Sequence, residues 1–172
     1  MKNFRENKGF TMIELIITIA ILSFGITGVF MAFSPFVTLN YSVSSRFTAV
    51  YLAQEGLEVI RNIRDNNFIN KLTWSDGGLT NCQGGCQADY KTGTLVETFD
   101  NQLKPYDPDN FLKINGDGFY GYDGGVDTIF KRKITITQPS GTDTLKVKVQ
   151  VFWDYNGQSF DFETIGYLYN WY

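Results

Sequence analysis

An apolar run from Phe10 to about Phe33 is the strongest pattern in the chain, and a basic segment at residues 1–9 precedes it. These positions, about 24 in number, form a helix roughly 36 Å long at 1.5 Å per residue, which is enough to cross a bilayer. Positive charge marks the cytoplasmic flank of such a helix. The pattern therefore predicts a transmembrane helix over residues 10–35, with the rest of the chain on the exoplasmic side.

Residues 36–68 follow a second pattern, in which apolar or small residues recur at steps of three or four, as in an amphipathic helix. These positions are Phe36, Leu39, Val43, Phe47, Val50, Ala53, Leu57, Ile60 and Ile63. We expect one long helix from about Thr11 to Asn66, with a bend or break near Pro35. Its second half should bury the apolar stripe on a globular head.

The head, residues 69–172, begins with a loop-rich stretch and ends with clear strand patterns. Strict alternation over 145–154 predicts a strand with one buried face. Strands are also predicted at 128–138 and 159–171, and Asn156–Gly157 predicts a two-residue type I′ hairpin turn. Shorter strands are plausible at 94–99, 111–114 and 118–122. The fold class expected is α+β, a long helix packed on a C-terminal three-stranded antiparallel meander.

The charged residues are nearly balanced, with 15 basic and 18 acidic side chains and a formal net charge of −3. This balance argues against a general nucleic-acid coat, which needs clustered positive charge. On the outer face of the helix we expect two spaced charge pairs, Glu58 with Arg61 and Arg61 with Asp65.

The chain has no histidine. The commonest general base and the commonest neutral metal ligand are therefore missing, and no nucleophile motif is present. We expect a protein that is not an enzyme and that has no cofactor and no metal site.

The two cysteines, Cys82 and Cys86, lie in the sequence CQGGC. One close pair suits a single disulfide in an oxidising compartment, and Gly84 and Gly85 allow the sharp turn that it needs. The alternative is two free thiols in a loop. The predicted exoplasmic location favours the disulfide.

Glu14 is the one charged residue between Gly9 and Ser45. A secretory signal peptide would have a shorter apolar core and a small-residue cleavage site, which this run lacks. A plain membrane anchor would explain the length and the flanking charges, but not an acid that costs about 2.5–3.5 kcal/mol or more at the centre of a membrane helix.

The stretch KGFTMIELIITIAIL (residues 8–22) resembles the prepilin signature of bacterial type IV pilins and pseudopilins. The resemblance implies a leader at residues 1–9, cleavage after Gly9 by a prepilin peptidase, N-methylation of the new N-terminal Phe10, and a role for Glu14 in assembly. It also implies other pilin subunits, the peptidase and methylase, and an inner-membrane assembly platform as partners. The stretch AQEGLEVIRNIRDNNF (residues 53–68) resembles minor pilins of the pilus-modification type.

Elementary electrostatics indicates a function for Glu14. After cleavage Phe10 would carry an ammonium group, and Glu14, four residues later, would share its helix face and meet the positive end of the helix dipole. In a fibre, Glu14 of an incoming subunit would meet the Phe10 ammonium of the subunit already in place. Such a buried pair fixes register rather than adding stability.

Two weaker patterns favour ordinary structure over a site. Four acids could supply oxygens for calcium, but they have no EF-hand spacing and fit soluble turns: Asp107, Asp109, Asp117 and Asp123. A small basic patch could contact DNA, although a solvated strand face that guards against edge pairing is the simpler interpretation: residues 130–133, Lys146 and Lys148.

The sequence thus predicts a minor pilin of a type IV pilus-like fibre, processed by prepilin peptidase and assembled from the inner membrane with its head exoplasmic. One alternative is a pseudopilin of a type II secretion or DNA-uptake system. An alternative of another class is a membrane-anchored exoplasmic binding domain that does not polymerise.

Overall fold

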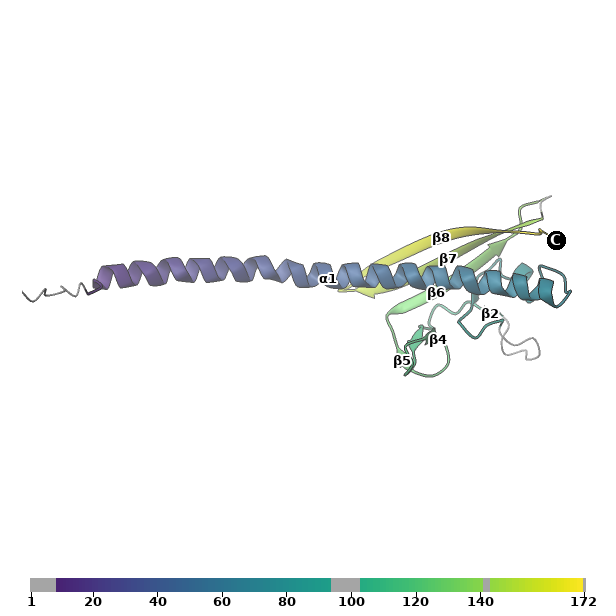
Figure 1. Cartoon of the computed structure of the whole chain (residues 1–172), viewed down its shortest axis with the longest axis horizontal. Helices are drawn as coiled ribbons and strands as arrows, with labels where there is room; N and C mark the ends of the chain where they lie inside the picture. The colour runs from purple at the N-terminus through teal and green to yellow at the C-terminus, as the bar shows by residue number, and fades with distance from the viewer. Residues whose placement is uncertain (1–8, 94–102, 141–142, 172) are drawn as a thin grey trace, which may run out of the picture. The chain divides into compact units, whose positions relative to one another are not determined.

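The computed structural model describes residues 9–93, 103–140 and 143–171, so the strand expected at 94–99 lies outside the described residues (Figure 1). The chain divides into two units, one that ends at Val43 and one that comprises Ser44–Tyr172. The first is the N-terminal part of a helix. The second holds the rest of that helix and all the strands.

Helix α1 (Met12–Ile69) runs without interruption through Pro35, so of the bend or break expected there the break is wrong. A proline removes one helical hydrogen bond, and the helix continues on both sides of it. α1 ends in a Schellman motif: Lys71 has a φ of 56°, its N–H donates to the Phe68 carbonyl at 3.1 Å, and the Leu72 N–H donates to the Asn67 carbonyl at 2.9 Å. The end of the helix therefore falls close to the predicted stop.

The buried face of α1 differs from the predicted stripe. Ala53, Ile60 and Ile63 are buried as expected, and small or polar residues complete that face: Ser45, Ala49, Gly56, Arg64 and Asn67. The upstream members of the stripe are exposed within the chain: Phe36, Leu39, Val43 and Phe47. Because this face of α1 lies close to the sheet, it needs small side chains. A pattern that records only whether residues are apolar does not reveal that need.

The outer face of the helix also differs in one ion pair. Glu58 and Arg61 pair as predicted. Asp65 pairs with its neighbour Arg64 at 2.7 Å, and not with Arg61. The guanidinium of Arg64 is mostly buried, so it holds the carboxylate next to it at the head surface.

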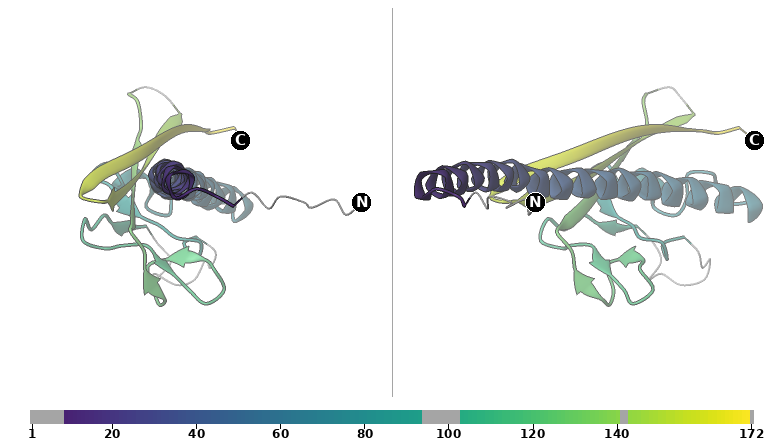
Figure 2. Two further views of the ribbon diagram at one scale, coloured as in Figure 1. Left: turned by 90° about the vertical axis from the view of Figure 1, so that its left-hand side faces the viewer. Right: turned by 60° about the vertical axis from the view of Figure 1, so that its left-hand side comes forward.

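The head is built on a five-stranded antiparallel sheet of order β2-β1-β6-β7-β8. Its strands are β1 (Cys86–Gln87), β2 (Lys104–Pro105), β6 (Phe130–Thr137), β7 (Thr144–Tyr155) and β8 (Gln158–Tyr169). β6, β7 and β8 form the predicted meander, and they lie along the C-terminal part of α1 (Figure 1 and Figure 2). The α+β arrangement is confirmed.

A separate three-stranded sheet of order β4-β3-β5 stands beside the main one. It consists of β3 (Lys113–Ile114), β4 (Tyr120–Gly121) and β5 (Val126–Asp127). The short strands expected at 111–114 and 118–122 are therefore present. A 3-10 helix, η1 (Leu79–Asn81), precedes β1.

The core lies between α1 and the main sheet. The alternating residues of β7 are buried as predicted: Leu145, Val147, Val149, Val151 and Trp153. They meet Leu52, Ala53 and Ile60 of the helix in one cluster. At Gly56 the contact is so close that a Cβ would lie 2.9 Å from Cγ1 of Val149.

Arg132 of β6 is fully buried in this core. Its guanidinium donates to the carbonyl of Leu52 at 2.8 Å and to that of Ala88, and it lies 3.5 Å from the carboxylate of Glu55. These contacts offset part of the cost of burying the guanidinium, although its Nε has no hydrogen-bond partner among the described residues. Arg132 thus joins the helix, the segment after β1 and the sheet.

The β7–β8 hairpin turns at Asn156 and Gly157, which have φ angles of 51° and 74°. Both residues take the positive φ that a type I′ turn needs, so the predicted turn is confirmed.

We expect Gly157→Val to destabilise the head by roughly 1 kcal/mol or more, because a β-branched residue is strained at positive φ. A Cβ at Gly157 meets nothing within 4 Å, so the effect would be backbone strain and not a clash. Gly116→Val is the matched control, since that position is equally open and has no positive φ. Thermal unfolding of both variants measures the difference. Equal melting temperatures for Gly157→Val and wild type would contradict the strain at this turn.

Candidate functional site

The N-terminal part of α1 is apolar enough to cross a membrane. Met12–Phe33, 22 residues, is the one such helical segment among the described residues, and it is unburied within the chain. At 1.5 Å per residue it is about 33 Å long, close to the thickness of a hydrocarbon core. This segment fits a membrane anchor.

The hydroxyl groups in this segment are satisfied by their own helix. Thr18 donates to the carbonyl of Glu14, Ser23 to that of Ile19 at 2.7 Å, and Thr27 to that of Ser23 at 2.8 Å. Such bonds to the preceding turn remove the cost of a hydroxyl in an apolar medium. The carboxylate of Glu14 differs, since it has no hydrogen-bond or ion-pair partner among the described residues.

The start of α1 is capped by Thr11. Its Oγ1 accepts the N–H of Glu14 at 3.3 Å, and its carbonyl accepts the N–H of Leu15 at 3.2 Å. Thr-x-x-Glu is the pattern of a capping box, of which the half from Thr11 is formed. The letters TMIE carry this signal, which the sequence analysis missed. Glu14 stands in the first turn, where the helix dipole favours an anion.

Phe10 precedes this cap and lies outside the helix. In the full-length chain Phe10 thus stands before the helix that holds Glu14, and the shared helix face expected after cleavage stays a prediction. Phe10 is 81% exposed and thus available to another molecule.

Gly9 also lies before the helix, in the same exposed stretch. A Cβ at Gly9 would meet nothing within 4 Å. Neither packing nor positive φ requires a glycine there.

Cys82 and Cys86 form a disulfide, with Cα atoms 5.4 Å apart, so the free-thiol interpretation is wrong. Both residues are buried. The loop is part of the sheet edge, since the Cys82 carbonyl accepts the N–H of Ile136 at 3.1 Å and the Gly85 carbonyl accepts that of Tyr106 at 3.0 Å. Gly85 has a φ of 107°, which favours glycine in the turn.

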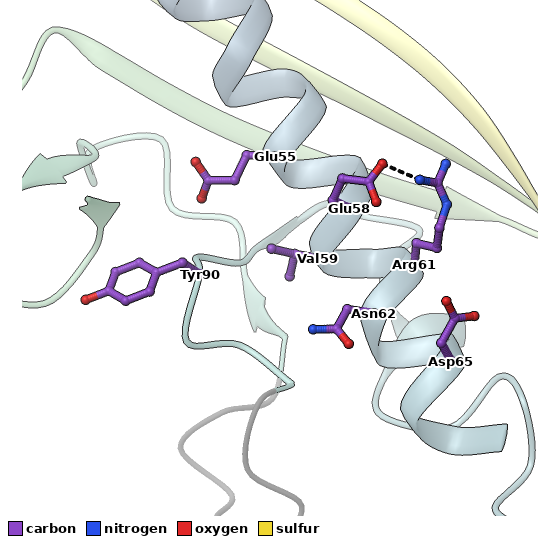
Figure 3. A pocket seen from close by; sticks show the side chains of 7 residues that line it. All are labelled: Glu55, Glu58, Val59, Arg61, Asn62, Asp65 and Tyr90. Carbon is purple, nitrogen blue, oxygen red and sulfur yellow. Dashed lines mark hydrogen bonds and ion pairs between the residues drawn. The ribbon is translucent and has the colours of Figure 1, made fainter. Parts of the chain in front are cut away.

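A groove of about 450 Å³ lies between α1 and Tyr90 (Figure 3). Its seven lining residues are Glu55, Glu58, Val59, Arg61, Asn62, Asp65 and Tyr90. Each acid has an ion-pair partner, namely Arg132, Arg61 and Arg64 in turn. The groove therefore offers no unpaired charge to a ligand.

The weaker sequence patterns are explained by local structure. Among the described residues no group of three or more His, Cys, Asp or Glu side chains gathers. Lys131 and Lys133 lie over the rings of Phe111 and Tyr106. Lys148 pairs with Glu163 at 3.6 Å. The basic patch is thus largely engaged within the head.

Tyr122 shows how the loops of the head are fixed. Its hydroxyl donates to the Arg132 carbonyl at 3.2 Å, and burial raises its pKa to about 12 although Arg132 opposes the shift. The phenol therefore stays protonated and keeps this bond at any ordinary pH. Tyr122 is therefore a structural hydrogen-bond donor that ties its loop to β6.

Comparison with known proteins points to the N-terminal segment. Residues 4–30 match the family model described as the prokaryotic N-terminal methylation motif. No curated protein and no solved structure matched the chain significantly. The match supports a type IV pilin-like or pseudopilin-like protein that is processed at its N-terminus, and the α+β arrangement of helix on sheet agrees with this class. It covers the segment with Gly9, Phe10 and Glu14 and does not reach the head.

We expect Cys82 and Cys86 to resist alkylation in unfolded protein until a reductant is added, because the disulfide and not burial alone blocks them. Denaturant is needed, since both sulfurs are buried in the folded head. Mass spectrometry after alkylation with and without reductant counts the labelled thiols. Two labels without reductant would contradict the pairing in the mature protein.

Proposed function

We propose that this chain is a minor pilin, a structural subunit of a type IV pilus-like fibre that is assembled from the inner membrane. The observation that carries the proposal is the isolation of Glu14. The hydroxyls around it are bonded to the helix, whereas its carboxylate has no partner among the described residues. The methylation motif over residues 4–30 supports the same conclusion.

In this proposal a prepilin peptidase cleaves after Gly9, and a methylase modifies the amine of Phe10. Both residues are exposed before the helix cap, where an enzyme can reach the peptide bond without unwinding α1. The new ammonium would stand four residues from Glu14 along the chain. Because the helix begins at Met12, its partner would be the Glu14 of a neighbouring subunit. The contact between subunits would then supply the missing partner of each charge.

The segment 10–35 would anchor the precursor in the inner membrane with residues 1–9 in the cytoplasm. The head would lie outside, where a disulfide between Cys82 and Cys86 persists. The partners proposed are other pilin subunits, the processing enzymes, the assembly platform and membrane lipid. A pseudopilin of a secretion or DNA-uptake system would use the same N-terminal segment in the same way.

Processing tests the first step. We expect Gly9→Val to block cleavage, because a branched side chain obstructs the peptidase at the bond to Phe10. The fold itself has room for a side chain there. Gly25→Val is the matched control, since that glycine also has nothing within 4 Å but lies inside the apolar helix. Intact mass of membrane-extracted protein should show loss of residues 1–9 in wild type and control only. An uncleaved wild-type chain in cells with an active prepilin peptidase would contradict the proposal.

Assembly tests the role of Glu14. Glu14→Val should still be cleaved and inserted, because it removes a charge from an apolar segment. Its amount in sheared fibres should fall at least roughly tenfold, because an unpaired buried charge costs about 3–5 kcal/mol. Glu58→Val, which removes an exposed acid of the head, is the control and should assemble normally. Immunoblots of the fibre and membrane fractions give the ratio. Equal incorporation of Glu14→Val and wild type would contradict the pairing, and absence of the wild-type chain from fibres would favour the anchored binding domain.

A further inference from the structure

The two edges of the five-stranded sheet differ in how they are protected against pairing with a further strand. At one edge β2 is two residues long and ends in Pro105, which cannot donate to a further strand. The strand behind it, β6, is also covered. Its outward-facing groups bond as follows: the Phe130 carbonyl to the Leu112 N–H at 2.8 Å, the Arg132 carbonyl to the Tyr122 hydroxyl at 3.2 Å, and the Ile136 N–H to the Cys82 carbonyl at 3.1 Å.

The opposite edge is β8, the outermost strand in Figure 1. Its twelve residues pair with β7 one for one, without a bulge, and contain no proline. Residues 164–169 carry no charge. The devices that proteins use to protect a sheet edge are thus missing from the second half of β8.

The register identifies the groups that β8 presents. In an antiparallel pair, the N–H and C=O of each residue point to the same side, and successive residues alternate. The backbone groups of Arg132 and Ile134 point away from β7, toward the β1 side of the sheet. The backbone groups of the alternate residues, Lys131, Lys133 and Thr135, therefore bond to β7. By the same alternation Val149 and Val151 of β7 bond to Thr164 and Phe162 of β8.

The outward-facing backbone groups of β8 therefore belong to the alternate residues: Asp161, Glu163, Ile165 and Tyr167. No hydrogen bond to these backbone groups occurs among the described residues of the chain. Their side chains lie on the exposed face of the sheet, and Ile165 and Tyr167 are 44% and 52% exposed. The outer edge of β8 thus exposes backbone donors, backbone acceptors and apolar side chains together.

We propose that the free edge of β8 is a docking site that takes up an extended segment of a partner protein as an additional strand. In this mode of recognition the backbone bonds provide affinity, and alternate side chains provide specificity. The partner is a peptide with basic side chains at two alternating positions, beside Asp161 and Glu163, and apolar side chains at the next two, beside Ile165 and Tyr167. Cross-strand pairs of these kinds stabilise a sheet.

The charges on β8 argue against a second copy of the same strand as the occupant. β8 contains Asp161 and Glu163 but no lysine or arginine. Paired antiparallel with itself, the strand would set these carboxylates against each other, against Ile165 or against tyrosines, and never against a cation. Only Glu163 has a cation nearby, Lys148 on β7. A basic segment from another protein compensates both acids.

Hydrogen exchange of the full-length protein in detergent tests the proposal. Without a partner, the N–H groups of Asp161, Glu163, Ile165 and Tyr167 should exchange quickly, and those of the alternate residues that face β7 slowly. The probes are two synthetic peptides, Val-Thr-Val-Thr-Lys-Thr-Lys and its reverse, because the added strand can run in either direction. At least one should slow exchange of the outward amides by about tenfold or more and leave the amides that face β7 unchanged.

The controls separate edge pairing from unspecific binding. A peptide of the same composition without alternation, Thr-Thr-Val-Val-Lys-Lys-Thr, should give no protection. Tyr167→Lys should abolish protection by placing a cation beside the apolar half of the peptide. Val126→Lys, at an exposed apolar position on β5, should leave protection intact.

Three results would overturn the proposal. One is no protection by either alternating peptide, and another is equal protection by the control peptide. The third is protection that appears without peptide and grows with protein concentration, which would identify a second copy as the occupant. None of these results bears on cleavage at Gly9 or on Glu14, so the proposed function is tested separately.

Discussion

The close contact between α1 and the sheet at Gly56 is the constraint on which the rest of the head depends. A side chain at this position would meet Val149 and the stem of Arg132, so the helix could not lie where it does. With the helix this near, the guanidinium of Arg132 reaches the carbonyl of Leu52 in the helix and that of Ala88 beyond β1. One glycine thus allows the bonds that hold three parts of the head together.

The two charged groups in apolar surroundings, Arg132 and Glu14, differ in whether they have partners within the chain. Arg132 is fully buried, and two hydrogen bonds and an ion pair within the head compensate it in part. Glu14 lies in the apolar segment without a partner among the described residues, although the hydroxyls of Thr18 and Ser23 are bonded. A charge that the chain satisfies serves its own stability. In the proposed function the partner of Glu14 is the Phe10 ammonium of a neighbouring subunit, a pairing that would offset the cost of a charge in lipid.

Much of the head could be predicted because its strongest signals are local. The alternation along β7 identifies its buried face, and Asn156–Gly157 identifies the hairpin. The two cysteines are close enough in sequence to indicate their disulfide. The sequence TMIE is also a local signal, since it is the pattern of a capping box, but the cap at Thr11 was not predicted from it.

Other features depend on contacts that no local pattern records. The buried face of α1 is set by the small residues that the sheet requires, above all Ala49 and Gly56, and not by the row of large apolar residues upstream. β1 and β2 are two residues long, too short for any periodicity, and they exist because β6 and the disulfide loop hold them. The partners of Arg132 come from segments far apart in sequence. At the N-terminus, the roles of Gly9 and Phe10 rest on resemblance, since the fold makes no demand on either residue.

The bond between Arg132 and Leu52 also has a consequence for the order of events during biosynthesis. It joins residues 80 positions apart, and β7 and β8, which complete the core, come later still. The amphipathic part of α1 leaves the ribosome long before the strands that cover it, and loop closure over such distances is slow. If the head crosses a membrane as proposed, it must do so as an open chain and close only once its last strand has arrived. The exposed helix would need a chaperone or the membrane surface until then.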